Sequence, residues 1–240
     1  MRIIFSDLDG TLLLRGEKEL NKNIKKSIYS VLENGDIFAI SSGRTYIELK
    51  QILKEFENDI YFITNDGSLV VYKEQTLLDF PMDKSMFKDF KNYTAHGKYV
   101  TYIKSPSSLL IRNTMKQYQN HTMLIDCIDE INEDIYKISD FDKTIPCPLE
   151  VVYKNARMNE YIKDGVDKSI AVKHILKLTN ISSDNAYAFG DNVNDIGMFK
   201  ECKNSYAVST ASPRIKKCAN KVTYNIEEEI ANITYRRNKI

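Results

Sequence analysis

The chain has 240 residues, and its 34 basic and 33 acidic side chains give a formal net charge of +1 at pH 7. This balance argues against nucleic acid or an anionic membrane surface as a partner. The apolar runs are far shorter than the roughly 20 residues that a membrane-spanning helix needs. Four cysteines without C-x-x-C spacing indicate reduced thiols in a cytoplasmic protein.

The N-terminal third alternates short apolar runs with amphipathic stretches. Uninterrupted, partly β-branched runs predict strands that are covered on both faces; these runs are residues 2–5, 36–40 and 60–64. Apolar side chains at helical spacing predict helices over residues 21–35 and 44–57. A hairpin is expected at residues 68–80.

The middle of the chain, about residues 82–160, breaks this alternation. Strands are expected at residues 98–104, 109–112 and 149–153, helices near residues 84–93 and 128–139, and an irregular stretch at residues 144–149. A long excursion within one domain is one interpretation. We favour an inserted α+β domain, because a structureless connection of this length is uncommon in a compact fold.

The C-terminal third returns to the first pattern. Strands are expected at residues 186–189, 205–209 and 221–224, and helices at residues 169–179, 194–202 and 212–219 and from Ile226. Strand and helix in alternation at both ends predict an α/β fold with a doubly wound, Rossmann-like parallel sheet. The predicted domains are a core of residues 1–81 and 161–240 and an inserted domain of residues 82–160.

Two aspartates end the first expected strand, in the sequence D-L-D-G-T. Residues i and i+2 of an extended chain point the same way. Asp7 and Asp9 should therefore project together from the carboxyl end of the strand, where open α/β sheets bind ligands. Two carboxylates about 4 Å apart repel by roughly 1 kcal/mol in water. Protonation of one carboxylate or a cation between the two would relieve this repulsion. An acidic turn that only caps the strand is the alternative.

A second acidic cluster, in the sequence G-D-N-V-N-D, follows the strand expected at residues 186–189. Its position on the carboxyl edge of a parallel sheet should bring Asp191 and Asp195 near the first pair of aspartates. Four carboxylates without His or Cys beside them suit a hard divalent cation, and Mg²⁺ fits better than Zn²⁺. Alternatively, Asn194 and Asp195 only cap the next helix.

Two further elements can hold an anion. The sequence A-I-S-S-G-R-T ends the second expected strand just before a helix, so backbone N–H groups near Gly43 and the Ser42 hydroxyl can bind phosphate oxygens. An ordinary helix N-cap is the alternative. Lys168 begins a helix, where a cation is unfavourable unless an anion lies opposite. A solvated surface lysine is the alternative for this residue.

Taken in order, these motifs resemble the four motifs of the haloacid dehalogenase superfamily. They are D-L-D-G-T from Asp7, S-G-R from Ser42, Lys168, and G-D-x-x-N-D from Gly190. The fine pattern resembles the Cof-type phosphatase branch. The short spacing from Asp9 to Ser42 leaves room for one helix and for no inserted domain. The long insertion between Ser42 and Lys168 is similar to the α/β cap that this branch carries after its third core strand.

The resemblance implies a Mg²⁺-dependent phosphatase that hydrolyses small phosphomonoesters through an aspartyl-phosphate intermediate. Sugar phosphates are the leading candidate substrates. Asp7 would be the nucleophile and Asp9 the acid and base. The implied metal residues are Asp7, the backbone carbonyl of Asp9, Asp191 and, as an orienting group, Asp195. The implied phosphate-binding residues are Leu8 through its backbone, Ser42, Gly43, Lys168 and Asn194.

Contacts to the leaving group are less defined. Arg44 is one candidate, and Asp66 is another, because N-D-G-S stands at residues 65–68 where relatives often have N-G-A. The segment at residues 144–149 and the tyrosines of the inserted domain are further candidates. The three histidines show no metal-ligand spacing, and His174 is assigned no role.

Other functions stay open from the sequence. A phosphomutase or phosphotransferase would return the phosphoryl group to a sugar, and a non-catalytic protein could bind phosphorylated metabolites on the same scaffold. A receiver domain would be about half this length and would carry its phosphorylated aspartate on a middle strand. The expected partner is a small phosphorylated metabolite, with no nucleic acid and no membrane, bound by a monomer or homodimer.

Overall fold

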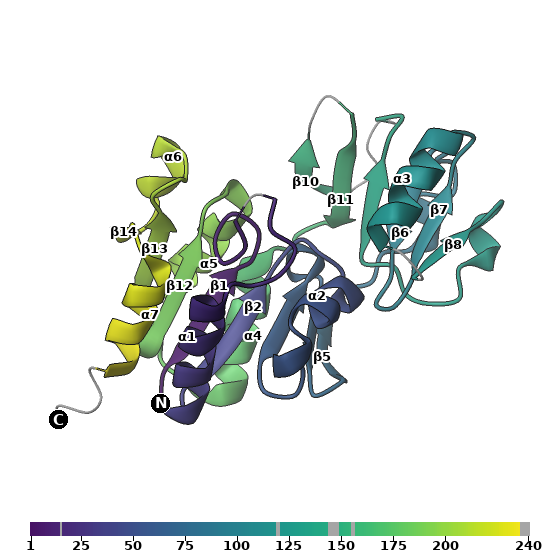
Figure 1. The fold of residues 1–240 in the computed structure, drawn as a ribbon. Coiled ribbons are helices and arrows are strands. Elements are labelled where there is room, and N and C mark those ends of the chain that lie inside the picture. The colour runs from purple at the N-terminus through teal and green to yellow at the C-terminus, as the bar shows by residue number, and fades with distance from the viewer. Residues whose placement is uncertain (15, 119–120, 144–148, 155–156, 236–240) are drawn as a thin grey trace.

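The computed structural model describes residues 1–14, 16–118, 121–143, 149–154 and 157–235 (Figure 1). Its strands form two sheets, one of eight strands in the order β14-β13-β12-β1-β2-β3-β4-β5 and one of six strands in the order β10-β11-β9-β6-β7-β8. We call them the large sheet and the small sheet. Figure 1 shows the small sheet beside the end of the large sheet that carries α2 and β5.

The large sheet is built from both ends of the chain. Its strands are β1 (Ile3–Asp7), β2 (Ile37–Ser41), β3 (Tyr61–Thr64), β4 (Leu69–Tyr72), β5 (Gln75–Asp79), β12 (Ala186–Gly190), β13 (Asn204–Val208) and β14 (Lys221–Thr223). The pairs from β14 through β3 are parallel, and β4 and β5 add an antiparallel hairpin at the edge. The predicted doubly wound α/β fold is confirmed.

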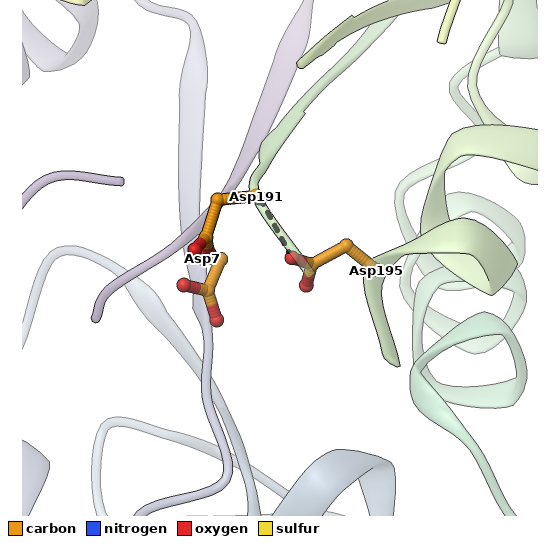
Figure 2. Close-up of side chains that lie close together, drawn as sticks. All are labelled: Asp7, Asp191 and Asp195. Atoms are coloured by element: carbon orange, nitrogen blue, oxygen red, sulfur yellow. Dashed lines mark hydrogen bonds between the residues drawn. The ribbon is translucent and has the colours of Figure 1, made fainter. Parts of the chain in front are cut away.

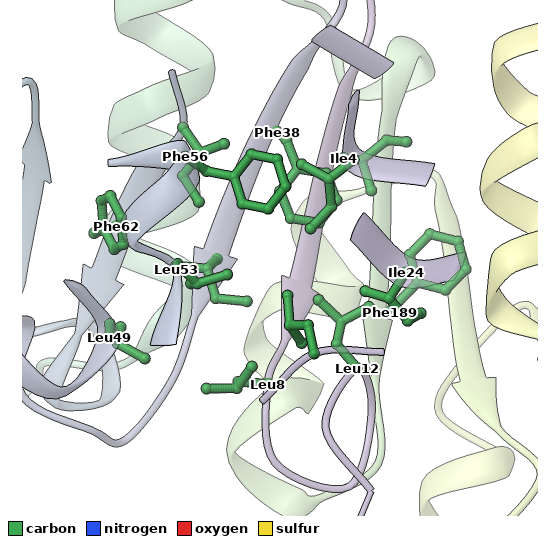
Figure 3. Close-up of a cluster of buried hydrophobic side chains, with 14 of the residues drawn as sticks. Ile4, Leu8, Leu12, Ile24, Phe38, Leu49, Leu53, Phe56, Phe62 and Phe189 are labelled. Carbon is green, nitrogen blue, oxygen red and sulfur yellow. The ribbon is translucent and has the colours of Figure 1, made fainter. Parts of the chain in front are cut away.

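Helices cover both faces of the large sheet. They are α1 (Lys22–Glu33), α2 (Tyr46–Ile52), α4 (Lys168–Thr179), α5 (Ile196–Glu201), α6 (Pro213–Lys216) and α7 (Ile226–Tyr235). Ile4 of β1 packs in a cluster with α1, α2 and α7 (Figure 3), whereas Ile3 and Phe5 pack with α4, α5 and α6 on the other face. Because both faces are buried, the strand sequences are continuous apolar runs rather than alternating ones.

The small sheet comes from the middle of the chain. Its strands are β6 (Tyr93–His96), β7 (Thr101–Lys104), β8 (Thr122–Leu124), β9 (Lys137–Asp140), β10 (Leu149–Lys154) and β11 (Asn159–Lys163), and α3 (Ser108–Tyr118) joins β7 to β8. It has a separate apolar cluster around Phe87, Tyr93, Ile138 and Tyr161. The domain boundaries at residues 82 and 160 stay a prediction.

Two helix predictions in the middle of the chain were wrong. Residues 84–93 hold only the 3-10 helix Lys84–Met86 before β6 begins, and residues 128–139 hold only the 3-10 helix Ile128–Glu130 before β9 begins. The apolar residues of the first segment follow a helical spacing. However, Phe87 and Phe90 reach the small-sheet cluster from the irregular segment after this 3-10 helix. A local pattern cannot distinguish such a segment from an amphipathic helix.

The strand expected at residues 109–112 was also wrong, because these residues lie in α3. The Ser107 hydroxyl accepts a hydrogen bond from the backbone N–H of Leu110 at 3.3 Å, which is an N-terminal capping contact. The apolar run therefore begins a helix rather than a buried strand, and Leu109 is largely exposed.

Residues 144–148 of the expected irregular stretch lie outside the described residues. No helix among the described residues has both the length and the apolar character to cross a membrane.

Candidate active site

Three aspartates gather at the carboxyl ends of β1 and β12 (Figure 2). Asp7 is the last residue of β1, Asp191 follows β12 directly, and Asp195 ends the 3-10 helix Val193–Asp195 before α5. One carboxylate oxygen of each lies within 4.8 Å of the other two. Parallel pairing of β1 with β12 brings the two loops to one sheet edge although they are far apart in the sequence.

Lys168 lies between two of these carboxylates. Its Nζ is 2.7 Å from Asp7 Oδ1 and 2.7 Å from Asp195 Oδ1, and it donates to the Ser41 carbonyl at 3.1 Å. The side chain is fully buried, which rules out a solvated surface lysine. Burial lowers the pKa of Lys168, but the charges of Asp195 and Asp7 outweigh burial and raise it, so the ammonium stays charged.

Asp195 connects the lysine to the loop after β12. While Oδ1 faces Lys168, Oδ2 accepts a hydrogen bond from the backbone N–H of Asp191 at 3.0 Å (Figure 2). It accepts a second one from the backbone N–H of Asn192, also at 3.0 Å. Both oxygens are therefore in use. This arrangement suits a residue that orients the Asp191 loop better than one that binds a ligand directly.

The Asp9 carboxylate does not join the other three. Its oxygens accept from Arg44 Nε at 2.8 Å and from Nη2 at 2.6 Å, and half of its side chain is exposed. The expected convergence of four carboxylates fails here because β1 ends at Asp7, and the i, i+2 rule holds only while the chain stays extended. Gly10 then turns the chain with φ +89°, and a Cβ there would lie 2.6 Å from Asp191 Oδ2.

The predicted phosphate-binding residues lie near this cluster. Ser42 is buried directly after β2, and its hydroxyl accepts a hydrogen bond from the Arg44 backbone N–H at 3.2 Å. Asn194 Nδ2 donates to Asp66 Oδ1 at 2.8 Å, and the buried Asn194 Oδ1 has no hydrogen-bond partner among the described residues. Leu8 is buried, and its carbonyl accepts backbone bonds from the turn that follows.

The turn after β3 is held against the start of α4. Asn65, Asp66 and Gly67 all have positive φ angles, of 48°, 59° and 103°. A Cβ on Gly67 would lie 2.3 Å from the Asp167 carbonyl oxygen. The turn that carries Asp66 therefore packs directly on the helix start that carries Lys168.

A cavity of about 750 Å³ opens above these groups, with Asp7, Asp9 and Asp191 among its lining residues. The small sheet contributes His96, Lys137, Val152, Lys154 and Glu160 to the lining. None of these was a candidate from the sequence. No tyrosine is among the described lining residues, so contacts from the tyrosines of the inserted domain stay a prediction. The one available signal is a charged residue inside an apolar strand, such as Lys137 between Tyr136 and Ile138.

Comparison with known proteins decides the family. The model of the haloacid dehalogenase-like hydrolases matches residues 4–231. The chain belongs to this family. The predicted superfamily and the prediction of a hydrolase are thereby confirmed.

Individual relatives of this haloacid dehalogenase-like hydrolase align along nearly the whole chain. The 5-amino-6-(5-phospho-D-ribitylamino)uracil phosphatase YcsE of Bacillus subtilis (strain 168) is 23% identical over 96% of this chain and 93% of its own. The phosphatase of the same name in Escherichia coli (strain K12), YbjI, is 22% identical over 90% and 88%. The structure of the subclass IIB sugar phosphatase BT4131 superposes with a TM-score of 0.78 at 17% identity, covering 99% of each chain.

The acidic cluster of this haloacid dehalogenase-like hydrolase fits a divalent metal ion. Burial, with smaller contributions from Asp195 and Asp191, raises the pKa of Asp7 against the opposing effect of Lys168. Burial and Asp195 raise the pKa of Asp191 to about 6. Ionising two neighbouring carboxylates is costly, but the ionised pair becomes favourable when both groups bind one cation. Carboxylate oxygens are donors that suit Mg²⁺.

We expect Mg²⁺ to raise the melting temperature more at about pH 7.5 than at about pH 5. The folded-state pKa of Asp191, about 6, lies above its ordinary value of 3.8. The folded protein therefore holds an extra proton between these values and loses stability as pH rises through them. At low pH, Mg²⁺ must displace that proton before it can bind. At high pH, it relieves the repulsion among the ionised carboxylates of Asp7, Asp191 and Asp195.

Differential scanning fluorimetry with and without Mg²⁺ measures this effect without any substrate. Asp191→Asn is the matched variant, because it removes the titrating charge and should remove most of the Mg²⁺-dependent shift at both pH values. Equal Mg²⁺ shifts at the two pH values in the unmodified protein would contradict the expectation.

Proposed function

We propose that this chain is a Mg²⁺-dependent phosphatase that hydrolyses small phosphomonoesters, with sugar and sugar-alcohol phosphates as the first substrates to test. The observation that carries the proposal is a buried aspartate, Asp7, which lines a cavity and contacts Lys168 beside two further carboxylates. The relatives support the substrate class, because two are phosphatases of a phosphoribityl compound and one is a sugar phosphatase.

In the proposed reaction an oxygen of Asp7 attacks phosphorus, the bond from phosphorus to the leaving oxygen breaks, and an aspartyl phosphate forms. Asp9, once it has taken up a proton from solvent, gives that proton to the leaving oxygen. It then takes a proton from the water that attacks the aspartyl phosphate, which releases phosphate and restores Asp7. The contact of Lys168 with Asp7 Oδ1 fixes the orientation of the nucleophile before substrate arrives.

Arg44 must move for this reaction to proceed. It holds both oxygens of Asp9, and a carboxylate held by a bidentate guanidinium cannot exchange a proton with the substrate. We propose that the bound substrate takes over the contacts of Arg44, which frees Asp9. This assigns Arg44 the substrate contact that the sequence pattern indicated.

Charge in the proposed site would be balanced by a bound metal ion together with side chains of the protein. Asp7, the backbone carbonyl of Asp9 and Asp191 would hold Mg²⁺, while Asp195 orients the Asp191 loop. The bound ion would neutralise charge that develops on the phosphoryl oxygens. Lys168 uses all three of its ammonium donors on protein atoms, so it contributes to phosphate binding mainly through its charge.

The remaining phosphoryl contacts are proposed for the backbone at Leu8 and Gly43, the Ser42 hydroxyl and the Asn194 amide, since preformed donors supply most of the stabilisation in phosphoryl transfer. We further propose that residues 82–160 act as a cap. Side chains from the small sheet line the same cavity, so a closed cap would exclude water from the aspartyl phosphate and would contact the leaving group.

We expect the purified protein to release phosphate from an aryl phosphate in the presence of Mg²⁺, to lose this activity with EDTA and to regain it with excess Mg²⁺. Colorimetric detection of phosphate measures the release. A panel of sugar phosphates then separates hydrolysis from mutase chemistry, because a mutase would form an isomer instead of free phosphate. Phosphate release that EDTA does not affect would contradict the metal requirement.

A further inference from the structure

Lys137 of the small sheet lines the same cavity as Ser42 and Gly43, which follow β2 of the large sheet. Lys137 is the first residue of β9 and is 6% exposed. Its Nζ donates to the Gly43 carbonyl and lies 3.8 Å from Asp66 Oδ2 and 3.6 Å from Glu160 Oε2. Burial lowers the pKa of Lys137, but the charges of Glu160 and Asp66 outweigh burial and raise it, so it is a buried cation.

Asp66, its partner on the large sheet, connects both loops to which phosphate contacts are assigned above. Asp66 Oδ1 accepts from Asn194 Nδ2 at 2.8 Å, and its backbone N–H donates to the Ser42 carbonyl at 3.1 Å. A Cβ on Gly43 would lie 3.0 Å from Asp66 Oδ2. Asp66 thus orients the Asn194 amide, but it also places a buried negative charge, 4% exposed, beside the expected position of a phosphate dianion.

We propose that Lys137 and Asp66 form a charge-compensating pair through which the small sheet completes the phosphate pocket. Asp66 orients Asn194, and Lys137 cancels the charge of Asp66 only when the small sheet lies over the large one. Both are positioning residues, and neither contacts the reacting atoms. This inference rests on the proposed function, because it assumes that an oxyanion binds between Ser42 and Asn194.

The pair gives a distinctive double-mutant pattern. Removing one partner of a buried ion pair leaves the other charge uncompensated, whereas removing both is much milder. Lys137→Met leaves the Asp66 carboxylate facing the anion, and it leaves Glu160, whose side chain is 17% exposed, to be compensated by solvent. Asp66→Asn keeps a side-chain oxygen that can accept from Asn194 and leaves Lys137 paired with Glu160. The two substitutions should therefore be strongly non-additive.

The experiment measures the Kd of inorganic phosphate by isothermal titration calorimetry with saturating Mg²⁺. We expect Lys137→Met to raise Kd by about tenfold or more, Asp66→Asn to raise it by about threefold or less, and the double variant to stay within about threefold of the unmodified protein. Lys137→Gln retains a donor for the Gly43 carbonyl but no charge and should behave like Lys137→Met, which guards against misfolding of one variant. Lys137→Arg should restore binding.

Lys98 offers a matched control. It also crosses from the small sheet to the large sheet, where its Nζ donates to the Glu74 carbonyl at 3.2 Å and to Thr76 Oγ1 at 3.0 Å, but it does not line the cavity. Lys98→Met should leave the phosphate Kd within about twofold. A loss as large as that of Lys137→Met would attribute the effect to general loosening between the sheets and would overturn the proposal.

The turnover assay on the unmodified protein separates this inference from the proposed function. Hydrolysis with additive Kd effects overturns the charge-compensating pair and leaves the phosphatase standing. Phosphate binding with the expected non-additive pattern but without hydrolysis of any ester overturns the phosphatase and supports the pair. Absence of any phosphate binding overturns the pair, and absence of hydrolysis overturns the phosphatase.

Discussion

Asp7→Asn is expected to lower kcat for an aryl phosphate by about four orders of magnitude or more. The amide cannot act as the nucleophile that forms an acyl phosphate, while its size and shape keep the buried site intact. Steady-state kinetics with saturating Mg²⁺ measures the loss. Mass spectrometry of the acid-quenched protein should detect a phosphorylated form only in the chain that retains Asp7.

The control for this variant is its stability. Asp7 is buried, and burial raises its pKa above the ordinary range. Removing its charge therefore relieves the free-energy cost of a buried carboxylate in the metal-free protein. Lys168 keeps Asp195 as a partner at 2.7 Å. We therefore expect a metal-free melting temperature no lower than that of the unmodified protein. Robust turnover by a fully folded Asp7→Asn variant would remove Asp7 from the role of nucleophile.

Lys168→Met is expected to lower the free energy of unfolding by about 3–5 kcal/mol at neutral pH without metal, because it leaves two buried carboxylates without their cation. Urea unfolding followed by circular dichroism measures the change. The loss should shrink on acidification, since the raised pKa of Asp7 lets that carboxylate take up a proton as the pH falls. Mg²⁺ should also reduce the loss, because it supplies the missing positive charge.

The double variant Lys168→Met with Asp195→Asn tests the reason for this destabilisation. It removes the lysine and one of the carboxylates that the lysine neutralises, so it should be more stable than Lys168→Met alone. A double variant that is less stable by the sum of both single losses would show that packing, and not uncompensated charge, causes the effect.

The large sheet was predictable because its strands are buried on both faces, which makes the apolar runs around Ile3, Phe38 and Phe62 short, continuous and easy to separate from helices. The small sheet was not. Phe87 and Phe90 follow a helical spacing but pack from an irregular segment. Leu109 and Leu110 resemble a strand, but they follow the capping serine of a helix.

The same contrast holds for the site. Asp7 and Asp191 were predicted to lie together because each ends an expected parallel strand, and strand ends of this kind share one edge of a sheet. The exposed position of Asp9 depends on where the strand stops, which varies by a residue or two and is not encoded in a simple period. Lys137 depends on how two sheets meet, and no local pattern of the sequence carries that information.

The order of strands in the large sheet also affects how the protein folds during its synthesis on the ribosome. β1 is synthesised first, but its neighbour β12 emerges only after every strand of the small sheet has been made. Until then the nascent chain presents β1 as an open edge, and the aspartates that approach Asp7 do not yet exist. A product that stops before β12 would therefore keep Asp7 but lack Asp191 and Asp195, and it would expose a hydrophobic edge that promotes aggregation.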